Sequence, residues 1–394
     1  MPISRRRFLH TSSIALSAPF FAKFLGNKAE SALAIPQYLV PFTDSKFGNK
    51  VVKVTDPTKP VPGLSLTWEK VATHHYSIDQ AWNADQSLLI LVKGISGRLF
   101  LDGRTYKPLM ALKNPGELRW HPTNPNLMAF VGRKGVGYWN VRQNTIQVLN
   151  SLSNYTGLGF GESKGNLSDD GTMLAVTATR SDGKNVAFAF DLVNAKKYPD
   201  IDLSAWYEVG WTTISPLKKY VICYLRKTSS SDNQRLLFTL DGKLVQTWPE
   251  YERPGHGDFM VDSSGYELAV GRSKYDSYKM ITRRLVDGKI TFIGNPCKAS
   301  HTSARNLTYP GWVFASFTQG TPTSSQMPYS NEITAVATDG SQRVRRLAQH
   351  NSVDNGYDTE PHGSPSPDGK RAIFASNWGV KDGPVAAYVA EFAS

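Results

Sequence analysis

The sequence of 394 residues predicts an all-β protein, a seven-bladed β-propeller of four-stranded antiparallel blades. A turn followed by a short apolar strand recurs seven times between residues 65 and 394, at an average interval of about 47 residues. A second tight turn follows later in several of these repeats, and no long helical periodicity interrupts the series. Because two hairpin turns per period imply about four strands, each repeat has the content of one propeller blade.

The first turn of each repeat is rich in Asp, Pro, Gly or Asn, and the run after it is rich in apolar residues typical of buried strands. In chain order the turns lie at 81–87, 120–126, 167–171, 214–217, 261–265, 307–311 and 365–369. The strands that follow them lie at 88–91, 127–130, 173–176, 220–223, 268–270, 312–316 and 372–376. We expect four tryptophans near these elements to pack between blades: Trp82, Trp120, Trp312 and Trp378.

The second turn is an Asp-Gly pair, in which glycine accepts the positive φ that a hairpin turn needs. Such pairs begin at Asp102, Asp182, Asp241, Asp287 and Asp339. A Ser-, Thr-, Gly- and Pro-rich insert at 318–330 lengthens the sixth repeat and is expected to be a surface loop. Residues 35–64 lead into the first repeat, and we expect them to complete the last blade and close the ring. Six or eight blades are the alternatives to seven.

The amino terminus carries an export motif. Residues 4–9 (Ser-Arg-Arg-Arg-Phe-Leu) resemble the twin-arginine signal, an apolar run follows at 14–25, and residues 32–34 (Ala-Leu-Ala) offer a cleavage site. The apolar run is too short and interrupted to remain as a membrane span, and no later run approaches that length. We therefore predict a twin-arginine signal peptide at 1–34, a single propeller domain at 35–394, and a periplasmic or secreted protein.

The chain is basic, with 45 Lys and Arg residues against 33 Asp and Glu residues, a net charge of +12. The segment 1–34 holds five basic residues and one acidic residue, so a net charge of about +8 remains after it. An acidic polysaccharide, a membrane surface and nucleic acid are the partners that such a charge favours, and export disfavours nucleic acid. The basic residues are scattered, so a merely solvated surface is the alternative. We expect a monomer. Of two cysteines, Cys223 lies in an apolar run and is expected to be buried, while a disulfide with Cys297 is possible after export.

Four histidines lie at nearly the same place in four repeats. The repeats turn at Gln86, Gly265, Gly311 and Gly369, and the histidines precede these residues by eleven, nine, ten and seven positions. They are His75, His256, His301 and His362. Because equivalent positions of a repeat project toward the same face, we expect four imidazoles around one axis. Imidazole is the commonest side-chain metal ligand and a general base near neutral pH, so the pattern predicts a site.

The seventh repeat carries a family resemblance. In residues 360–369 (Glu-Pro-His-Gly-Ser-Pro-Ser-Pro-Asp-Gly), the Ser-Pro-Asp-Gly turn resembles TolB-like and WD40-like propeller repeats. The histidine ahead of this turn resembles the seven-bladed polysaccharide lyases, oligogalacturonate lyase and the ulvan lyases. The resemblance covers most of residues 40–394 as a blade pattern. It implies an enzyme that cleaves a uronate-containing polysaccharide by β-elimination: a base removes the proton beside the carboxylate, and arginine or a metal offsets the carboxylate charge.

Transferred to this chain, the resemblance implies roles for particular residues. The catalytic candidates are His75 and His256 as bases, Arg305 as the partner of the carboxylate, and Tyr357 as a base or an aromatic platform. The substrate-binding candidates are Tyr76, Arg253 and Glu162, of which Glu162 occupies the slot before Gly171 that His256 has in its own repeat. The candidate ligands of a divalent metal (Mn, Ca or Zn) are His301, Glu360 and His362.

Each assignment has a structural alternative, and the function has two rivals. His75 is either a site residue or a satisfied core histidine, Glu162 is either a site residue or a hydrogen-bonded structural residue, His121 is expected to be structural, and His350 is expected to be solvated. A non-catalytic propeller that binds a ligand or a protein, as TolB-like repeats do, is the first rival function. A metal redox protein that resembles nitrous oxide reductase is the second, although this chain lacks the additional copper domain and has few histidines.

Overall fold

The structure, a computed structural model, describes residues 34–393 except 162–163, 207, 227–232, 274–278, 295–298, 318–328 and 354–355. Residues Ala34–Ser394 form one compact unit. The predicted signal peptide lies outside the described residues apart from Ala34, as do Cys297 and most of the predicted loop at 318–330. Among the described residues, no helix has the length and apolar character that crossing a membrane requires.

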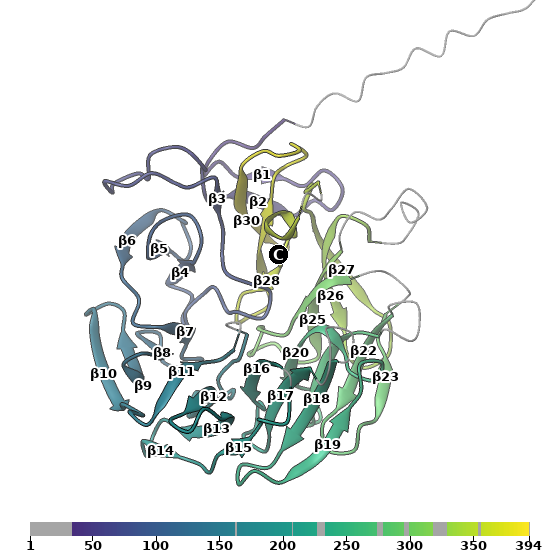
Figure 1. The fold of residues 1–394 in the computed structure, drawn as a ribbon. Coiled ribbons are helices and arrows are strands. Elements are labelled where there is room, and N and C mark those ends of the chain that lie inside the picture. The colour runs from purple at the N-terminus through teal and green to yellow at the C-terminus, as the bar shows by residue number, and fades with distance from the viewer. Residues whose placement is uncertain are drawn as a thin grey trace, which may run out of the picture. The chain divides into compact units, whose positions relative to one another are not determined.

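The unit Ala34–Ser394 is a seven-bladed β-propeller, as the sequence predicts (Figure 1). Blade 1 contains β4 (Leu88–Leu91), β5 (Arg98–Asp102) and β6 (Pro108–Leu112). Blade 2 contains β7 (Glu117–Trp120), β8 (Leu127–Gly132), β9 (Gly135–Asn140) and β10 (Thr145–Asn150). Blade 3 contains β11 (Tyr155–Gly159), β12 (Met173–Arg180), β13 (Asn185–Asp191), β14 (Lys196–Lys197) and β15 (Ile201–Asp202).

The later blades repeat the antiparallel pattern. Blade 4 contains β16 (Glu208–Ile214), β17 (Val221–Arg226), β18 (Asn233–Phe238) and β19 (Leu244–Trp248). Blade 5 contains β20 (Gly255–Val261), β21 (Glu267–Arg272), β22 (Met280–Arg284) and β23 (Ile290–Phe292). Blade 6 contains β24 (Ala299–Ser303), β25 (Trp312–Phe317), β26 (Glu332–Ala337) and β27 (Val344–Gln349). Blade 7 contains β28 (Ser364–Pro365), β29 (Arg371–Ser376) and β30 (Val385–Glu391), and the helical turn η1 (Tyr357–Thr359) precedes it.

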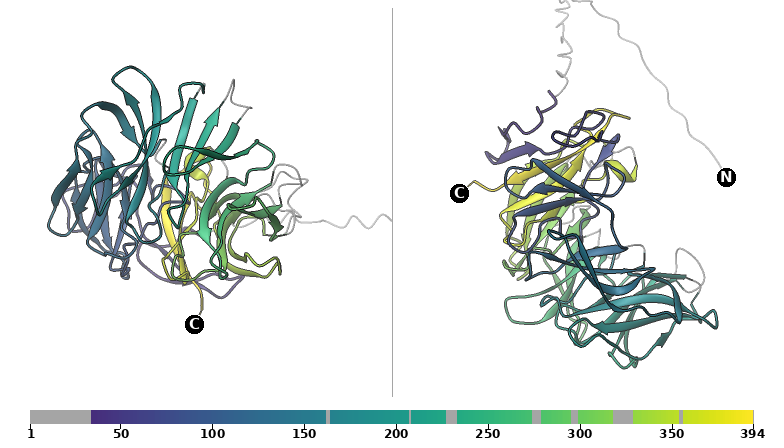
Figure 2. Two further views of the ribbon diagram at one scale, coloured as in Figure 1. Left: turned by 90° about the horizontal axis from the view of Figure 1, so that it is seen from below. Right: turned by 90° about the vertical axis from the view of Figure 1, so that its left-hand side faces the viewer.

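Strands from both ends of the domain close the ring in blade 7. β2 (Lys50–Lys53) pairs with β30 in antiparallel register, with Val51 opposite Ala390, and β1 (Phe42–Thr43) adds outside β2. These amino-terminal strands lie beside the carboxyl-terminal strand in Figure 2. The prediction that residues 35–64 complete the last blade is therefore confirmed. A propeller closed in this way holds its first and last blades together by backbone hydrogen bonds.

Apolar side chains pack between neighbouring blades. Among the described residues, a cluster of blades 1 and 2 joins Ile90 to Phe130, and a cluster of blades 7 and 1 joins Leu89 to Val389. The predicted packing of the tryptophans is confirmed, because Trp82, Trp120 and Trp378 are buried in such clusters and Trp312 packs against one. Burial of apolar surface between the faces of the blades is the main stabilising interaction of such a fold.

Blade 1 departs from the repeat in a way that affects the hub, the space enclosed by the innermost strands. Its sheet has three strands among the described residues, and a single bridge between Trp82 and Leu89 stands where an innermost strand would lie. β3 (Val71–Ala72) instead pairs in parallel with β30 of blade 7. Residues 73–82, here called the crossing segment, are bonded to blade 1 at both ends, since the N–H of Thr73 donates to the carbonyl of Lys93 and the N–H of Ile90 donates to the carbonyl of Ala81. Between these two points the segment extends into the hub.

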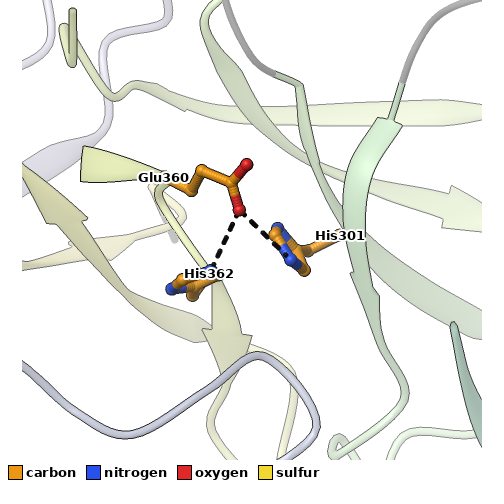
Figure 3. A group of neighbouring side chains, drawn as sticks. All are labelled: His301, Glu360 and His362. Atoms are coloured by element: carbon orange, nitrogen blue, oxygen red, sulfur yellow. Dashed lines mark hydrogen bonds and ion pairs between the residues drawn. The ribbon is translucent and has the colours of Figure 1, made fainter. Parts of the chain in front are cut away.

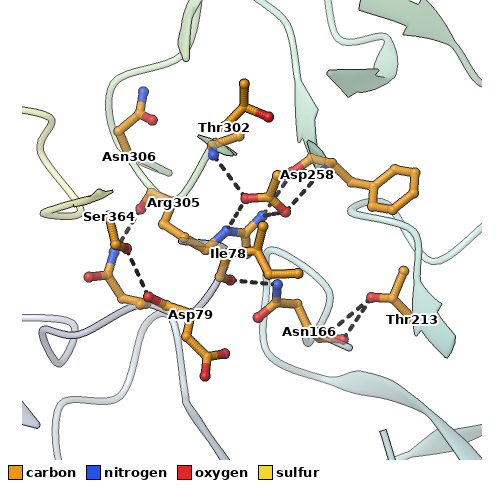
Figure 4. A network of polar contacts seen from close by, with 12 residues as sticks. Ile78, Asp79, Asn166, Thr213, Asp258, Thr302, Arg305, Asn306 and Ser364 are labelled. Carbon is orange, nitrogen blue, oxygen red and sulfur yellow. Dashed lines mark hydrogen bonds and ion pairs between the residues drawn. The ribbon is translucent and has the colours of Figure 1, made fainter. Parts of the chain in front are cut away.

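Other blades hold this crossing segment in place (Figure 4). The side-chain amide of Asn166 in blade 3 donates to the carbonyl oxygen of Ile78 over 2.8 Å. The hydroxyl of Ser364 in blade 7 donates to the carbonyl of Asp79 over 2.8 Å, and Gln80 donates to the carbonyl of Arg305 near blade 6 over 2.8 Å. Bonds to three separate blades fix the segment and the histidines that it carries.

Candidate functional site

Two histidines and one carboxylate meet where the innermost strands of blades 6 and 7 begin (Figure 3). His301 is the third residue of β24, and His362 lies two residues before β28. One carboxylate oxygen of Glu360 lies 3.5 Å from Nε2 of His301 and 3.3 Å from Nε2 of His362. The helical turn η1 ends just before Glu360, which is extended because the residue before a proline disfavours the helical conformation. The local sequence thus turns Glu360 toward both imidazoles.

His256 joins this group from blade 5. Its ring lies 5.2 Å from the ring of His301, which in turn lies 4.3 Å from the ring of His362, with both distances measured between centroids. We call His256, His301, Glu360 and His362 the histidine group. Three of the four histidines that the repeat register aligns therefore converge, from blades 5, 6 and 7.

Two members of the histidine group have a left-handed backbone. His256 and His362 both have φ of 46°, a conformation that costs about 1–2 kcal/mol for a residue with a side chain. A glycine follows each of them at a crowded position: a Cβ on Gly257 would lie 1.9 Å from the carbonyl oxygen of Val270, and one on Gly363 would lie 2.7 Å from the hydroxyl of Ser316. The corresponding bulge of blade 3 has a glycine, Gly157, with φ of 62°. Backbone strain of this kind gathers at functional sites.

Side chains from the following blade hold both strained residues. The hydroxyl of Thr302 in blade 6 donates to the carbonyl of His256 over 2.8 Å. Nε2 of His74, in the crossing segment, bonds to the carbonyl of His362 over 2.6 Å and acts there as the donor. His74 is buried, and this burial lowers its pKa to about 3, so its ring is neutral. Sequence reasoning placed His75 in the site and missed this positioning role of His74.

The imidazoles of the group are neutral near pH 7. Burial, reinforced by the neighbouring histidines and by Arg272, lowers the pKa of His301 well below its usual value. Burial also lowers the pKa of His362, although Glu360 acts in the opposite direction. His256 is exposed at its surface, and desolvation by its neighbours together with the charge of Arg272 lowers its pKa to about 4. Each ring therefore offers an unshared electron pair.

The geometry of His301, Glu360 and His362 suits a divalent metal. One candidate ligand atom from each residue lies within 4.8 Å of the other two. Nδ1 of His301 lies 3.0 Å from the hydroxyl of Ser300, and a hydrogen bond donated by Nδ1 leaves the electron pair on Nε2, which faces Glu360. Metal-binding histidines characteristically use their second nitrogen in this way. Neutral imidazoles and one carboxylate are suitable ligands for a divalent metal.

Aromatic and basic side chains surround the histidine group. The buried ring of Tyr76 lies 5.1 Å from His301 and 5.0 Å from His362, and Tyr357 stacks on it at 6.4 Å. Tyr357 is 53% exposed. The ammonium of Lys93 lies 5.0 Å from the ring of Tyr357, and that of Lys164 lies 5.6 Å from the ring of Tyr76. No sequence pattern singled out Lys93, Lys164 or Arg272.

His75 lines a cavity of about 940 Å³ together with residues of blades 1, 2 and 3. Its Nδ1 pairs with the carboxylate of Asp79, which also forms an ion pair with Arg119, with 2.7 Å between Nε and the carboxylate oxygen. The register argument placed His75 beside the other histidines, but the innermost strand of blade 1 that this argument assumes is replaced by the crossing segment.

The two predicted substrate arginines are held by carboxylates. The guanidinium of Arg305 is buried, bonds to Asp258 at 2.8 and 3.0 Å, and donates to the carbonyl of Phe259 (Figure 4). Arg253 is also buried and bonds to Glu250 at 2.9 and 2.6 Å. The structure does not bring Arg305 to the histidine group, whereas the charge of Arg253 does reach His256. Glu162 lies outside the described residues.

His350, His121 and Cys223 lie outside the histidine group. His350 was predicted to be solvated, and this is wrong, because its side chain is buried and bonds to the carbonyl of Phe317 over 2.7 Å. His121 is structural as predicted, since its Nδ1 accepts the backbone N–H of Asn124 over 3.1 Å. Cys223 is buried as a free thiol, as its apolar surroundings predict.

Comparison with solved structures finds the same fold in oligogalacturonate lyases. The chain is 16% identical to an oligogalacturonate lyase in complex with manganese, with a TM-score of 0.63, covering 90% of this chain and 96% of that one. It is 14% identical to an oligogalacturonate lyase from Vibrio parahaemolyticus, also with a TM-score of 0.63, covering 90% and 97%. No protein-family model and no curated protein matches the chain. At these identities the likeness shows the propeller fold.

Proposed function

We propose that this protein is a metal-assisted lyase that cleaves a uronate-containing polysaccharide or oligosaccharide by β-elimination. One observation carries the proposal: three neutral imidazoles and a carboxylate converge from blades 5, 6 and 7 of a propeller with the oligogalacturonate lyase fold. The net charge of +12 for the whole chain and the cations around the histidine group favour an anionic substrate.

His301, Glu360 and His362 would hold the metal. A bound divalent ion would offset the charge of the uronate carboxylate and so make the neighbouring C–H group more acidic. Two imidazole nitrogens beside one carboxylate favour Mn or Zn over Ca, because calcium prefers a set of oxygen ligands. Ser300, through its contact with Nδ1 of His301, would keep Nε2 directed at the ion.

His256 is the leading candidate for the base. Its neutral imidazole would take the proton from C5 of the uronate, whose electrons form the C4=C5 double bond while the bond from C4 to the glycosidic oxygen breaks. The departing oxygen takes a proton from water, which balances the reaction. The charges of Arg272 and Lys164, which act on His256, would also stabilise the carboxylate as negative charge develops next to it.

His75 is the second candidate for the base, because Asp79 orients its ring in the manner of a carboxylate that supports a catalytic imidazole. The two candidates respond differently to substitution. If His256 is the base, then His256→Gly lowers the rate of elimination about 10²–10⁴-fold while His75→Gln keeps most of it. The reverse result assigns the proton transfer to His75.

The activity test uses fragments of pectate, ulvan and alginate with added Mn²⁺ or Zn²⁺, and follows the ultraviolet absorbance of unsaturated uronate. We expect the wild type to produce this signal on at least one substrate, and His256→Gly to lose it. Asn194→Ala in the exposed turn after β13 is a matched control that should keep it, since Asn194 contacts Asp191 of the same turn. If the wild type with added metal produces no absorbance of unsaturated uronate on any of the substrates, the proposal is contradicted. Binding without elimination, unaffected by His256→Gly, favours the non-catalytic propeller.

Export by the twin-arginine route is part of the proposal, supported by the sequence of residues 4–9. Replacing Arg5 and Arg6 with lysine should retain the full-length chain in the cytoplasm, as measured by fractionation of expressing cells. An unchanged distribution between fractions contradicts this route.

A further inference from the structure

A large cavity lies beside the histidine group, on the same face of the propeller. Its volume is about 940 Å³, near the upper end of the range of about 300–1,000 Å³ that ligand pockets span. It is lined by the starts of β7 and β11 and by the crossing segment with His74 and His75. Because β7, β11, β20 and β24 are all innermost strands, their starts share one end of the hub. The cavity therefore opens on the blade 1–3 side of the face that carries the histidine group.

The acidic groups of the cavity already have partners. Asp79 is shared by His75 and Arg119, which lies 2.7 Å from it. Glu117 accepts the backbone N–H of Phe160 over 2.6 Å. The charge of Asp79 is therefore offset by Arg119 within the cavity.

Two further arginines line the same cavity, and neither forms an ion pair with a carboxylate among the described residues, although the charge of Asp79 acts on Arg98. Arg98, the first residue of β5, is half-buried, and the hydrogen bond that its guanidinium makes is to the carbonyl of the neighbouring Gly97 at 3.1 Å. Arg133 lies in the turn between β8 and β9 and is exposed. A guanidinium presents paired N–H donors that match a carboxylate, so these two side chains define an anion-binding wall.

We infer that this cavity binds a second, non-reacting carboxylated sugar of an oligosaccharide whose reacting unit lies at the histidine group, with Arg98 and Arg133 binding its carboxylate. The inference rests on the proposed function for the reacting unit. Hydroxyl groups of Ser151, Ser153 and Thr156 in the cavity wall provide hydrogen-bond partners for the sugar. The two positions lie side by side, because His74 lines the cavity and also bonds to the carbonyl of His362.

The test measures binding separately from catalysis. The mature protein is titrated calorimetrically with trigalacturonate and with triglucuronate in the presence of a chelator. Arg98→Met should weaken binding about ten- to hundredfold, as loss of a hydrogen-bonded charge pair does. Arg98→Lys should lie between, since lysine keeps the charge but loses the paired geometry. Arg133→Met, an exposed change without risk to folding, should weaken binding about threefold or more.

Two controls make the result specific. Arg104→Met is the same substitution at an exposed turn outside this cavity, and should leave binding unchanged. The carboxyl-reduced trisaccharides should bind weakly to every variant alike. Equal affinity of the wild type, Arg98→Met and Arg133→Met overturns the inference, as does the absence of wild-type binding to both trisaccharides.

Cleavage and trisaccharide binding test different parts of the molecule, so either can be lost without the other. If no uronate is cleaved but trisaccharide binding depends on Arg98, the lyase proposal fails and the cavity stands as an acidic-sugar site. If cleavage occurs and Arg98→Met and Arg133→Met keep the wild-type KM for a trisaccharide, the lyase proposal stands and the cavity assignment is overturned.

Discussion

Two polar clusters of the hub give their carboxylates different partners. We call the histidine group the mouth of the hub, and Asp258, Arg305 and the bonds of the crossing segment to blades 3, 6 and 7 its floor. At the floor, Asp258 and Arg305 are buried and bond to each other, and Asp258 also accepts the backbone N–H of Ala304. At the mouth, Glu360 faces two neutral imidazoles at 3.3 and 3.5 Å, and two of the three histidines of the group have a left-handed backbone. At the floor, the charge of Asp258 is offset by Arg305. At the mouth, the carboxylate of Glu360 and the neutral imidazoles of His301 and His362 face one another.

This difference shows which polar clusters hold the propeller together and which are available for chemistry. The floor network joins the crossing segment to blades 3, 6 and 7 with relaxed hydrogen bonds, so it positions the mouth from below. The mouth retains strain that Thr302 and His74 hold in place from neighbouring blades. Removing a floor residue should therefore damage stability, and removing a mouth residue should damage activity alone.

The largest expected effect is on the floor. Arg305→Met leaves the carboxylate of Asp258 buried without its partner, which should lower the free energy of unfolding by about 3–5 kcal/mol. Urea denaturation monitored by tryptophan fluorescence measures this change. A loss below about 1 kcal/mol would show that the pair does not anchor the floor.

A substitution at the mouth should reduce activity and have little effect on stability. Glycine suits the φ of 46° at position 256, so His256→Gly should change the free energy of unfolding by no more than about 1 kcal/mol. It should lower kcat by about 10²–10⁴-fold, the usual contribution of a general base. Parallel denaturation and activity measurements test both halves. A large loss of stability with activity retained would make His256 a structural residue.

The stability of the protein should depend on pH through His350, which lies outside the histidine group. Burial lowers the pKa of His350 to about 4, below the value of about 6.5 expected in the unfolded chain. The stability that depends on its neutral ring is therefore present above pH 6.5 and is lost as the pH falls toward 4, by up to about 3 kcal/mol. The neutral ring is needed because Nδ1 accepts the N–H of Ser352 while Nε2–H donates to Phe317.

His350→Gln tests this pH dependence, because glutamine can donate and accept hydrogen bonds without titrating. Its free energy of unfolding, measured between pH 7.5 and 4, should fall less steeply than that of the wild type. Equal slopes would exclude His350 as a source of acid sensitivity.

The smallest effect is expected at the rim of the mouth. Tyr357 is half-exposed and stacks on Tyr76, so Tyr357→Ala should remove an aromatic platform and raise KM about two- to tenfold. Tyr357→Phe keeps the ring and should leave both kcat and KM near the wild-type values. A large fall of kcat in Tyr357→Phe would instead assign the phenol a role in proton transfer.

The sequence was sufficient to predict the blades, because Asp-Gly turns and apolar strands recur locally in each of them. It also grouped His256, His301 and His362, since the register of innermost strands holds in blades 5, 6 and 7. It could not place His75, because blade 1 lacks the strand on which the register depends. Nor could it show that Arg305 pairs with Asp258 across two blades, a contact 47 positions apart in sequence. Lys164 and Arg272 reach the mouth from positions without any motif.

The proposed function depends on a divalent metal bound at the mouth of the hub by His301, Glu360 and His362. The most direct test is elemental analysis of the purified mature protein after equilibration with Mn²⁺ or Zn²⁺ and dialysis, for the wild type and for His362→Gly. Glycine suits the φ of 46° at position 362, so the variant should fold. We predict one ion per wild-type chain and none in the variant. A wild-type protein that retains no metal, or a variant that retains as much as the wild type, would contradict the claim.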